Sequence, residues 1–176
     1  MTDKQRDILR LSLLAVILLI LFYMQTMPAG LHIGRARPYL LIPFTVFVGM
    51  FERELPGAYF GLAAGLLWDT VSTEISGFHA LFLLAAGCAS GLLITHLMRN
   101  NHVTAIIFSS ATVFLHTFIY WLLFAVFPGG ADAAGLLFKF YLPNALLTCA
   151  LSPVLYWLMR MFRKALIRKE KGEYRY

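Results

Sequence analysis

Long runs of apolar residues, separated by short polar or turn-forming connections, dominate the pattern along the chain. The separating stretches include "PAGLHIGRARP", "ERELPG" and "PGGADAAG". A bilayer core about 30 Å thick takes about 20 apolar residues per helix, so the pattern predicts an all-α, polytopic membrane protein with about six transmembrane helices. A five-span arrangement is the alternative. The expected spans cover about 8–27, 38–51, 56–69, 78–98, 103–127 and 135–159.

Two of these runs, 38–51 and 56–69, are short, because at 1.5 Å per residue each covers only about 21 Å. Either the bilayer thins locally or the two helices form a shallow hairpin. The run at 8–27 is too long for a signal peptide and no A-x-A-like site closes it, so it is expected to be a retained span.

Composition supports the membrane assignment. Hydrophobic residues make up 60% of the 176 residues, and the mean hydropathy is +0.72, which leaves no room for a sizeable soluble domain. We therefore expect one transmembrane domain, 1–176, that ends in a basic tail, 160–176. This tail is either a topology anchor or a helix on the anionic inner leaflet.

The positive charges predict the orientation. With a cytoplasmic N-terminus, only Arg35, Arg37 and Lys139 of the 15 Lys and Arg residues lie outside. Both termini are then cytoplasmic, which requires an even number of spans. The basic residues cluster at the chain ends and in connections and form no patch interleaved with aromatic residues, so nucleic acid is not an expected partner.

Signatures of catalysis are missing from the sequence. There is no nucleophile elbow, no H-E-x-x-H, no phosphate-binding loop and no obvious carboxylate dyad, and Cys88 and Cys149 lack metal-ligand spacing. We therefore expect a non-enzymatic protein without a catalytic, cofactor or metal site. An intramembrane enzyme would have to rest on His116 and Asp69, which lie at different depths.

The stretch "GLLWDTVSTEISGFHAL", 65–81, places polar residues in an otherwise apolar chain. Asp69 ends an apolar run, and either a structural role at the helix end or a binding role is open. Gly77 restarts the chain, where a residue free to adopt positive φ is least strained. Before Asp69, Gly57, Gly61 and Gly65 recur every four residues, which is typical of closely packed membrane helices.

Two polar faces lie on the last two runs. In an antiparallel pair of helices, residues at equal depth have residue numbers that add up to a constant total. Matching the first face with the second in reverse order, from 109 with 152 to 120 with 141, gives nearly the same total for all four pairs, so the two faces would lie level. His116 is then either a hydrogen-bonded structural histidine, the more common case, or a proton relay or ligand site. The faces consist of Ser109, Thr112, His116 and Tyr120 and of Tyr141, Asn144, Thr148 and Ser152.

The segment 37–87 resembles the MreD family of rod shape-determining proteins of the bacterial inner membrane. The resemblance rests on a Pro-x-Leu-Leu element, a Gly-Leu-Leu-x-Asp element with a preceding glycine, and a later glycine followed by Ala-Leu. Tyr39 departs from the small polar or acidic residue that members often have, and Ile75 and Ser76 stand where a proline is common. The matching residues are Pro38, Leu40, Leu41, Gly61, Gly65, Leu66, Leu67, Asp69, Gly77, Ala80 and Leu81.

This resemblance implies a scaffold of the bacterial elongasome, active in rod cell shape and peptidoglycan synthesis. It implies binding to the single-span protein MreC and, through it, to MreB, a RodA-type glycosyltransferase and a penicillin-binding transpeptidase. It also implies a fold similar to the substrate-binding subunits of energy-coupling-factor transporters. The alternative function is therefore a solute-binding, vitamin-type transporter subunit, for which Trp68, Glu74 and Trp121 are candidate pocket residues.

Overall fold

The computed structural model describes residues 3–27, 36–72, 77–96, 101–128 and 133–173. Within these ranges the chain forms six continuous helices, two of which include a π-helical segment. The elements are α1 (Asp3–Thr26), α2 (Leu41–Glu52), α3 (Glu54–Asp69), α4 (Phe78–His96), α5 (His102–Trp121) continued by η1 (Leu122–Val126), and α6 (Ala133–Leu136) continued by η2 (Leu137–Tyr141) and α7 (Leu142–Glu173).

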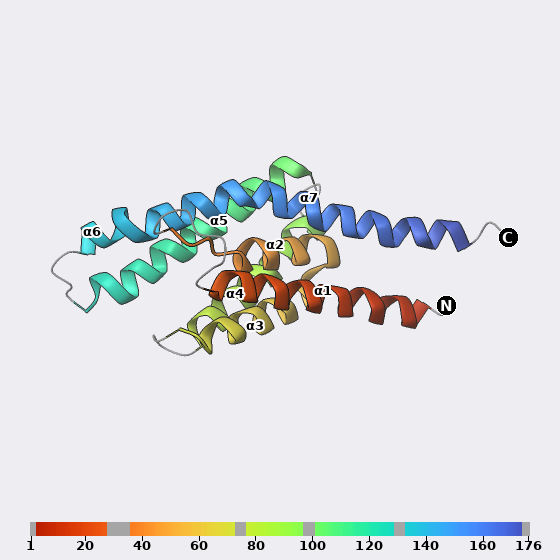
Figure 1. The fold of residues 1–176 in the computed structure, drawn as a ribbon, viewed down its shortest axis with the longest axis horizontal. Coiled ribbons are helices and arrows are strands. Elements are labelled where there is room, and N and C mark those ends of the chain that lie inside the picture. The colour runs from red at the N-terminus through yellow and green to blue at the C-terminus, as the bar shows by residue number, and fades with distance from the viewer. Residues whose placement is uncertain (1–2, 28–35, 73–76, 97–100, 129–132, 174–176) are drawn as a thin grey trace.

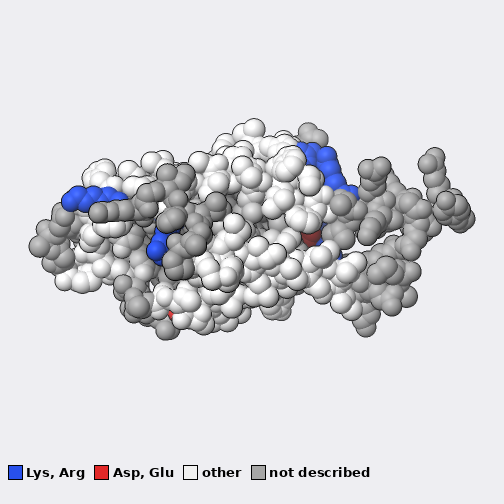
Figure 2. All heavy atoms as spheres, in the orientation of Figure 1, with Lys and Arg blue, Asp and Glu red and all other residues white. Residues whose placement is uncertain are grey.

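Four of the helices are long and apolar enough to cross a membrane: those covering Ile8–Thr26, Phe78–His96, His102–Val126 and Ala134–Lys164. The prediction of an all-α, polytopic membrane protein is thereby confirmed. On the face shown in Figure 2, the charged side chains of the described residues lie toward the two ends, and a broad uncharged band separates them. Such a band suits the apolar interior of a bilayer.

The short helix α2 forms the centre of the bundle. It has 12 residues, a length of about 18 Å, and every residue in it except Phe51 is buried. It packs against α3, α4, α5 and α7, and α1 covers part of it. The apolar side chains of α2 therefore contact the other helices of the protein, and few of them face lipid.

A single residue, Arg53, connects α2 to α3. Its φ of 77° lies in the left-handed region, which is rare for a residue with a side chain. The turn lies against α4, because a Cβ placed on Gly91 would come 2.3 Å from the backbone nitrogen of Glu54. The two short apolar runs thus form a tight hairpin that α4 holds in place.

Both chain ends lie at the same end of the molecule, where α1 and α7 extend beyond the other helices (Figure 1). The helical backbone of α7 continues through most of the predicted basic tail, to Glu173. The C-terminal end of α1, the end of α3 with the start of α4, and η1 with α6 lie toward the opposite end of the bundle (Figure 1). This opposite end is called the far end below.

Candidate functional site: an aromatic cavity at the far end of the bundle

Asp69 caps the first turn of α4. Its Oδ2 accepts hydrogen bonds from the backbone amides of Gly77 (2.9 Å) and Ala80 (3.0 Å), and its Oδ1 accepts one from the amide of His79 (3.2 Å). The amides at a helix N-terminus have no partner within the helix, and a carboxylate is favoured there by charge and by the helix dipole. Gly77 has a φ of 101°, in the region that favours glycine. This turn directs the amides at the start of α4 toward the carboxylate of Asp69.

The same carboxylate orients His79. Oδ1 of Asp69 lies 2.8 Å from Nδ1 of His79, and both side chains are buried. Because the carboxylate accepts, Nδ1 carries the proton of the neutral imidazole, and the other nitrogen, Nε2, is then an acceptor. Asp69 therefore has four donors within the protein, and its role in this structure is to join α3 to α4.

His116 lies in the middle of an aromatic cluster. Its ring centroid is 5.4 Å from those of Trp68 and His79, 5.0 Å from Phe82 and 5.8 Å from Tyr120. Only 2% of the residue is exposed, yet neither ring nitrogen has a hydrogen-bond partner among the described residues. The described residues therefore do not supply the hydrogen-bond partner expected for a structural histidine.

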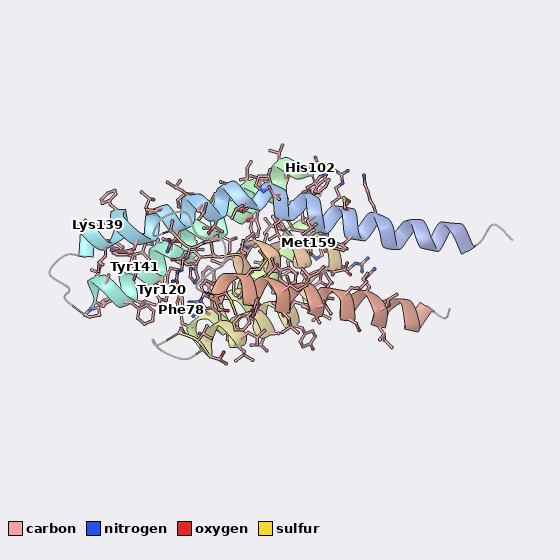
Figure 3. All side chains as sticks on the ribbon, in the orientation of Figure 1. Phe78, His102, Tyr120, Lys139, Tyr141 and Met159 are labelled. Atoms are coloured by element: carbon pink, nitrogen blue, oxygen red, sulfur yellow. The ribbon has the colours of Figure 1, made fainter. Side chains whose placement is uncertain are left out.

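A cavity of about 130 Å³ lies beside His116. A second cavity, of about 250 Å³, shares Tyr39 and Trp68 with it. Figure 3 shows Phe78, Tyr120 and Tyr141 together in this region, and His102 and Met159 nearer the end with the chain termini. The smaller cavity, called the aromatic cavity below, is lined by Tyr39, Trp68, Ser72, His79, His116, Thr117, Tyr120 and Tyr141.

The segment that leads into α2 is held by α7. The Oδ1 atom of Asn144 accepts from the backbone amide of Arg37 (2.8 Å), and its Nδ2 donates to the phenol oxygen of Tyr39 (3.0 Å). Oγ1 of Thr148 accepts from the amide of Tyr39 (2.8 Å). These three bonds fix Tyr39 in the cavity wall, and Pro38 between the two residues is buried.

The two predicted polar faces meet at some of the expected positions only. Ser109 and Ser152 are 3.2 Å apart, and the rings of Tyr120 and Tyr141 are 5.9 Å apart. Thr112 instead donates to the carbonyl of Phe108 in its own helix, and Asn144 and Thr148 bind segment 37–39 as described above. The antiparallel neighbours α5 and α7 thus share their polar faces with a third segment.

The glycines of α3 are used for packing within the bundle. A Cβ added to Gly61 would lie 2.2 Å from the carbonyl oxygen of Leu83, and one added to Gly65 would lie 2.3 Å from Cα of Ala80. A Cβ on Gly87 of α4 would similarly lie 2.1 Å from the carbonyl oxygen of Gly57. Helices α3 and α4 therefore approach at backbone distance along this face, as the glycine spacing predicted.

Several residues that carry the site were not singled out from the sequence. His79 follows Asp69 by ten residues, and Tyr39 departs from the family pattern, so no motif in the sequence points to either residue. At the other end, the buried carboxylate of Glu52 forms an ion pair with Arg10, which ties α1 to α2. Of the residues proposed for a vitamin pocket, Trp68 lines the aromatic cavity, Trp121 lies beside Phe118, and Glu74 falls outside the described residues.

Lys139 lies in η2, with its side chain exposed, far from the end with the chain termini (Figure 3).

Among the residues that the structure describes, no group of three His, Cys, Asp or Glu side chains is placed to hold a metal ion. The chemistry that the aromatic cavity offers is therefore stacking on its rings and hydrogen bonding to imidazole, hydroxyl and phenol groups.

Comparison with known proteins identifies the family. The family model described as rod shape-determining protein MreD matches residues 5–166, which is nearly the whole chain. No curated protein and no solved structure matches significantly. The family match extends well beyond the segment 37–87 that carried the resemblance in the sequence. The chain therefore belongs to the MreD family of rod shape-determining proteins.

Proposed function

We propose that this rod-shape-determining membrane protein is a non-enzymatic scaffold of the elongasome that binds the single-span protein MreC in the bacterial inner membrane. Through MreC it would act on MreB, on a RodA-type glycosyltransferase and on its penicillin-binding transpeptidase. The family match over residues 5–166 is the observation that carries this proposal. The position of both chain ends at one end of the bundle supports their lying on the same side of the membrane (Figure 1), and the positive charges favour the cytoplasmic side.

The surface that we propose for the MreC helix is the groove between α1 and α7. Its apolar floor includes Leu13, Leu14 and Ile17 of α1 and Met159 and Phe162 of α7, around a small cavity of about 30 Å³. The glycine face is already occupied by packing between α3 and α4. The partner helix would therefore dock on the larger apolar side chains of α1 and α7. Ridges of Leu and Ile side chains that fit into such grooves are the usual basis of helix packing.

The proposal is tested by purifying the tagged protein from membranes and measuring how much MreC it retains. Leu13→Trp fills the groove, so we expect it to lower the recovered MreC several-fold. Ile107→Trp is the matched control, since Ile107 is 63% exposed on α5, away from the groove, and it should retain MreC at the wild-type level. Equal recovery by both variants would move the docking surface elsewhere, and no recovery by the wild type would contradict the scaffold proposal.

The solute-binding alternative is favoured by one observation, the aromatic cavity at the far end. In that case the protein would work with an energy-coupling transporter partner in place of MreC. Recovery of such an ATPase complex in the same purification, with MreC absent, would support the alternative.

A further inference from the structure

We propose that the aromatic cavity binds a small, uncharged, planar ring that carries both a hydrogen-bond donor and a hydrogen-bond acceptor. This inference goes beyond the scaffold function, because it concerns the far end of the bundle and not the α1–α7 groove. Three properties of the cavity support it: an imidazole without partners, walls made of aromatic rings, and a volume that suits one ring.

The first property is the state of His116. A neutral imidazole has one donor and one acceptor nitrogen, and burial of both without partners is unfavourable. Among the described residues, no polar group forms a hydrogen bond with either nitrogen of His116. The two nitrogens point to opposite sides of the imidazole, so one ligand ring can bond one of them. A ligand that carries both a donor and an acceptor can bond that nitrogen whether or not it carries the proton.

The second property is the wall of the cavity. Four segments contribute rings: Tyr39 precedes α2, Trp68 ends α3, Tyr120 comes from α5 and Tyr141 from η2. Such rings bind the face or edge of another flat ring. None of the described residues that line the cavity is Asp, Glu, Lys or Arg, and the nearby carboxylate of Asp69 already accepts from four donors. A charged ligand would lose its hydration without gaining a charged partner, so an uncharged ligand fits better.

The third property is size. The volume of about 130 Å³ is close to that of a cavity of about 150 Å³ that accommodates benzene in another protein. One six-membered ring therefore fits. A few water molecules are the competing occupants, since a polar cavity of this size also holds water. The experiment must distinguish a bound ring from water.

The test uses the full-length protein in detergent with 4-pyridone as the probe, a single uncharged ring with an N–H donor and a C=O acceptor. Replacing Trp121 and Trp157 by Phe leaves Trp68 in the cavity wall as the only tryptophan of the three. We expect 4-pyridone to change the fluorescence of Trp68 saturably. His116→Phe keeps an aromatic ring but removes both nitrogens, and it should weaken the binding of 4-pyridone at least tenfold.

Thr112→Val is the matched control, because Thr112 is buried on the same helix and does not line the cavity. It should bind 4-pyridone as tightly as the parent protein. A second readout does not depend on the probe: without ligand, His116→Phe should raise the midpoint of thermal unfolding, since it removes two unpaired nitrogens. A histidine bonded to trapped water would instead be destabilised by the same change.

Two results would overturn the proposal. One is the absence of saturable binding of 4-pyridone to the parent protein, which would mean that the cavity holds water only. The other is equal binding by His116→Phe and the parent protein, which would show that the imidazole does not contact the ring. Neither result would affect the MreC proposal, because recovery of MreC is measured separately and depends on another surface.

Discussion

At the residue scale, Asp69 shows what a lone carboxylate can do in an apolar chain. It accepts three backbone amides and one imidazole N–H, and thereby fixes the start of α4 and the ring of His79. The sequence placed Asp69 at a helix end but left open whether it binds a ligand. The four donors could not be foreseen, because three of them are backbone groups that carry no signal in the sequence.

Asp69→Asn is expected to lower the free energy of unfolding by about 1–3 kcal/mol, the cost of leaving buried donors without acceptors. The amide group of Asn replaces one carboxylate oxygen, so that two of the four N–H groups face another donor. Thermal or denaturant unfolding in detergent measures the change. Ser72→Ala is the control, since the half-buried hydroxyl of Ser72 makes only a 3.3 Å bond to the carbonyl of Asp69. A similar loss in both variants would argue against the capping role.

At the element scale, the helical spacing of polar residues predicted which residues of α5 and α7 lie level with each other. It did not predict which group each of these residues bonds. Ser109 and Ser152 meet as expected. Asn144 and Thr148 instead bind the extended segment 37–39, about a hundred residues away. A periodic pattern indicates which face of a helix is polar, whereas the identity of a third segment on that face depends on the whole fold.

Cysteines at 109 and 152, in a background without Cys88 and Cys149, should form a disulfide readily under mild oxidation. The hydroxyl groups they replace are 3.2 Å apart and buried. Cysteines at 107 and 154 are the control, because these positions lie at the same relative depth but Ile107 and Val154 are 63% and 61% exposed. Gel mobility under non-reducing conditions measures both pairs. Equal yields would mean that α5 and α7 do not face each other through this stripe.

Gly61→Leu should prevent close packing of α3 on α4 and lower the amount of folded protein in the membrane. Even the first carbon of the side chain would lie 2.2 Å from the carbonyl oxygen of Leu83, and a backbone group cannot move aside cheaply. Ala85→Leu is the control, since Ala85 is an exposed small residue on α4. Size-exclusion profiles in detergent compare the two. A normal profile for Gly61→Leu would contradict the observed helix contact.

At the scale of the whole molecule, the apolar runs predicted an all-helical membrane protein, and four of its helices are long and apolar enough to cross a bilayer. The central position of α2 did not follow. Its apolar composition is that of a short membrane helix, and burial on every side depends on α4, α5 and α7, which come later in the chain. The aromatic cavity was equally hidden, because its lining comes from segments distant in sequence.

The shared position of the chain ends predicts that reporters fused to either terminus will report the same side of the membrane. With the positive charges inside, both ends should be cytoplasmic. A reporter inserted between Ser72 and Gly77, at the far end, should report the opposite side and serves as the control. A periplasmic signal from the C-terminal fusion, with a cytoplasmic signal from the N-terminal one, would require an odd number of crossings.

The burial of α2 also has a consequence for how the protein is made. A 12-residue helix is too short to partition into lipid as an independent span, and most of its native neighbours are translated after it. Of the helices described up to Asp69, α1 alone is long and apolar enough to be held by the bilayer independently. We therefore expect the α2–α3 hairpin to be synthesised early but to reach its final position late, after α4, α5 and α7 have been inserted around it. The central helix of the bundle would then be among the last elements to be assembled.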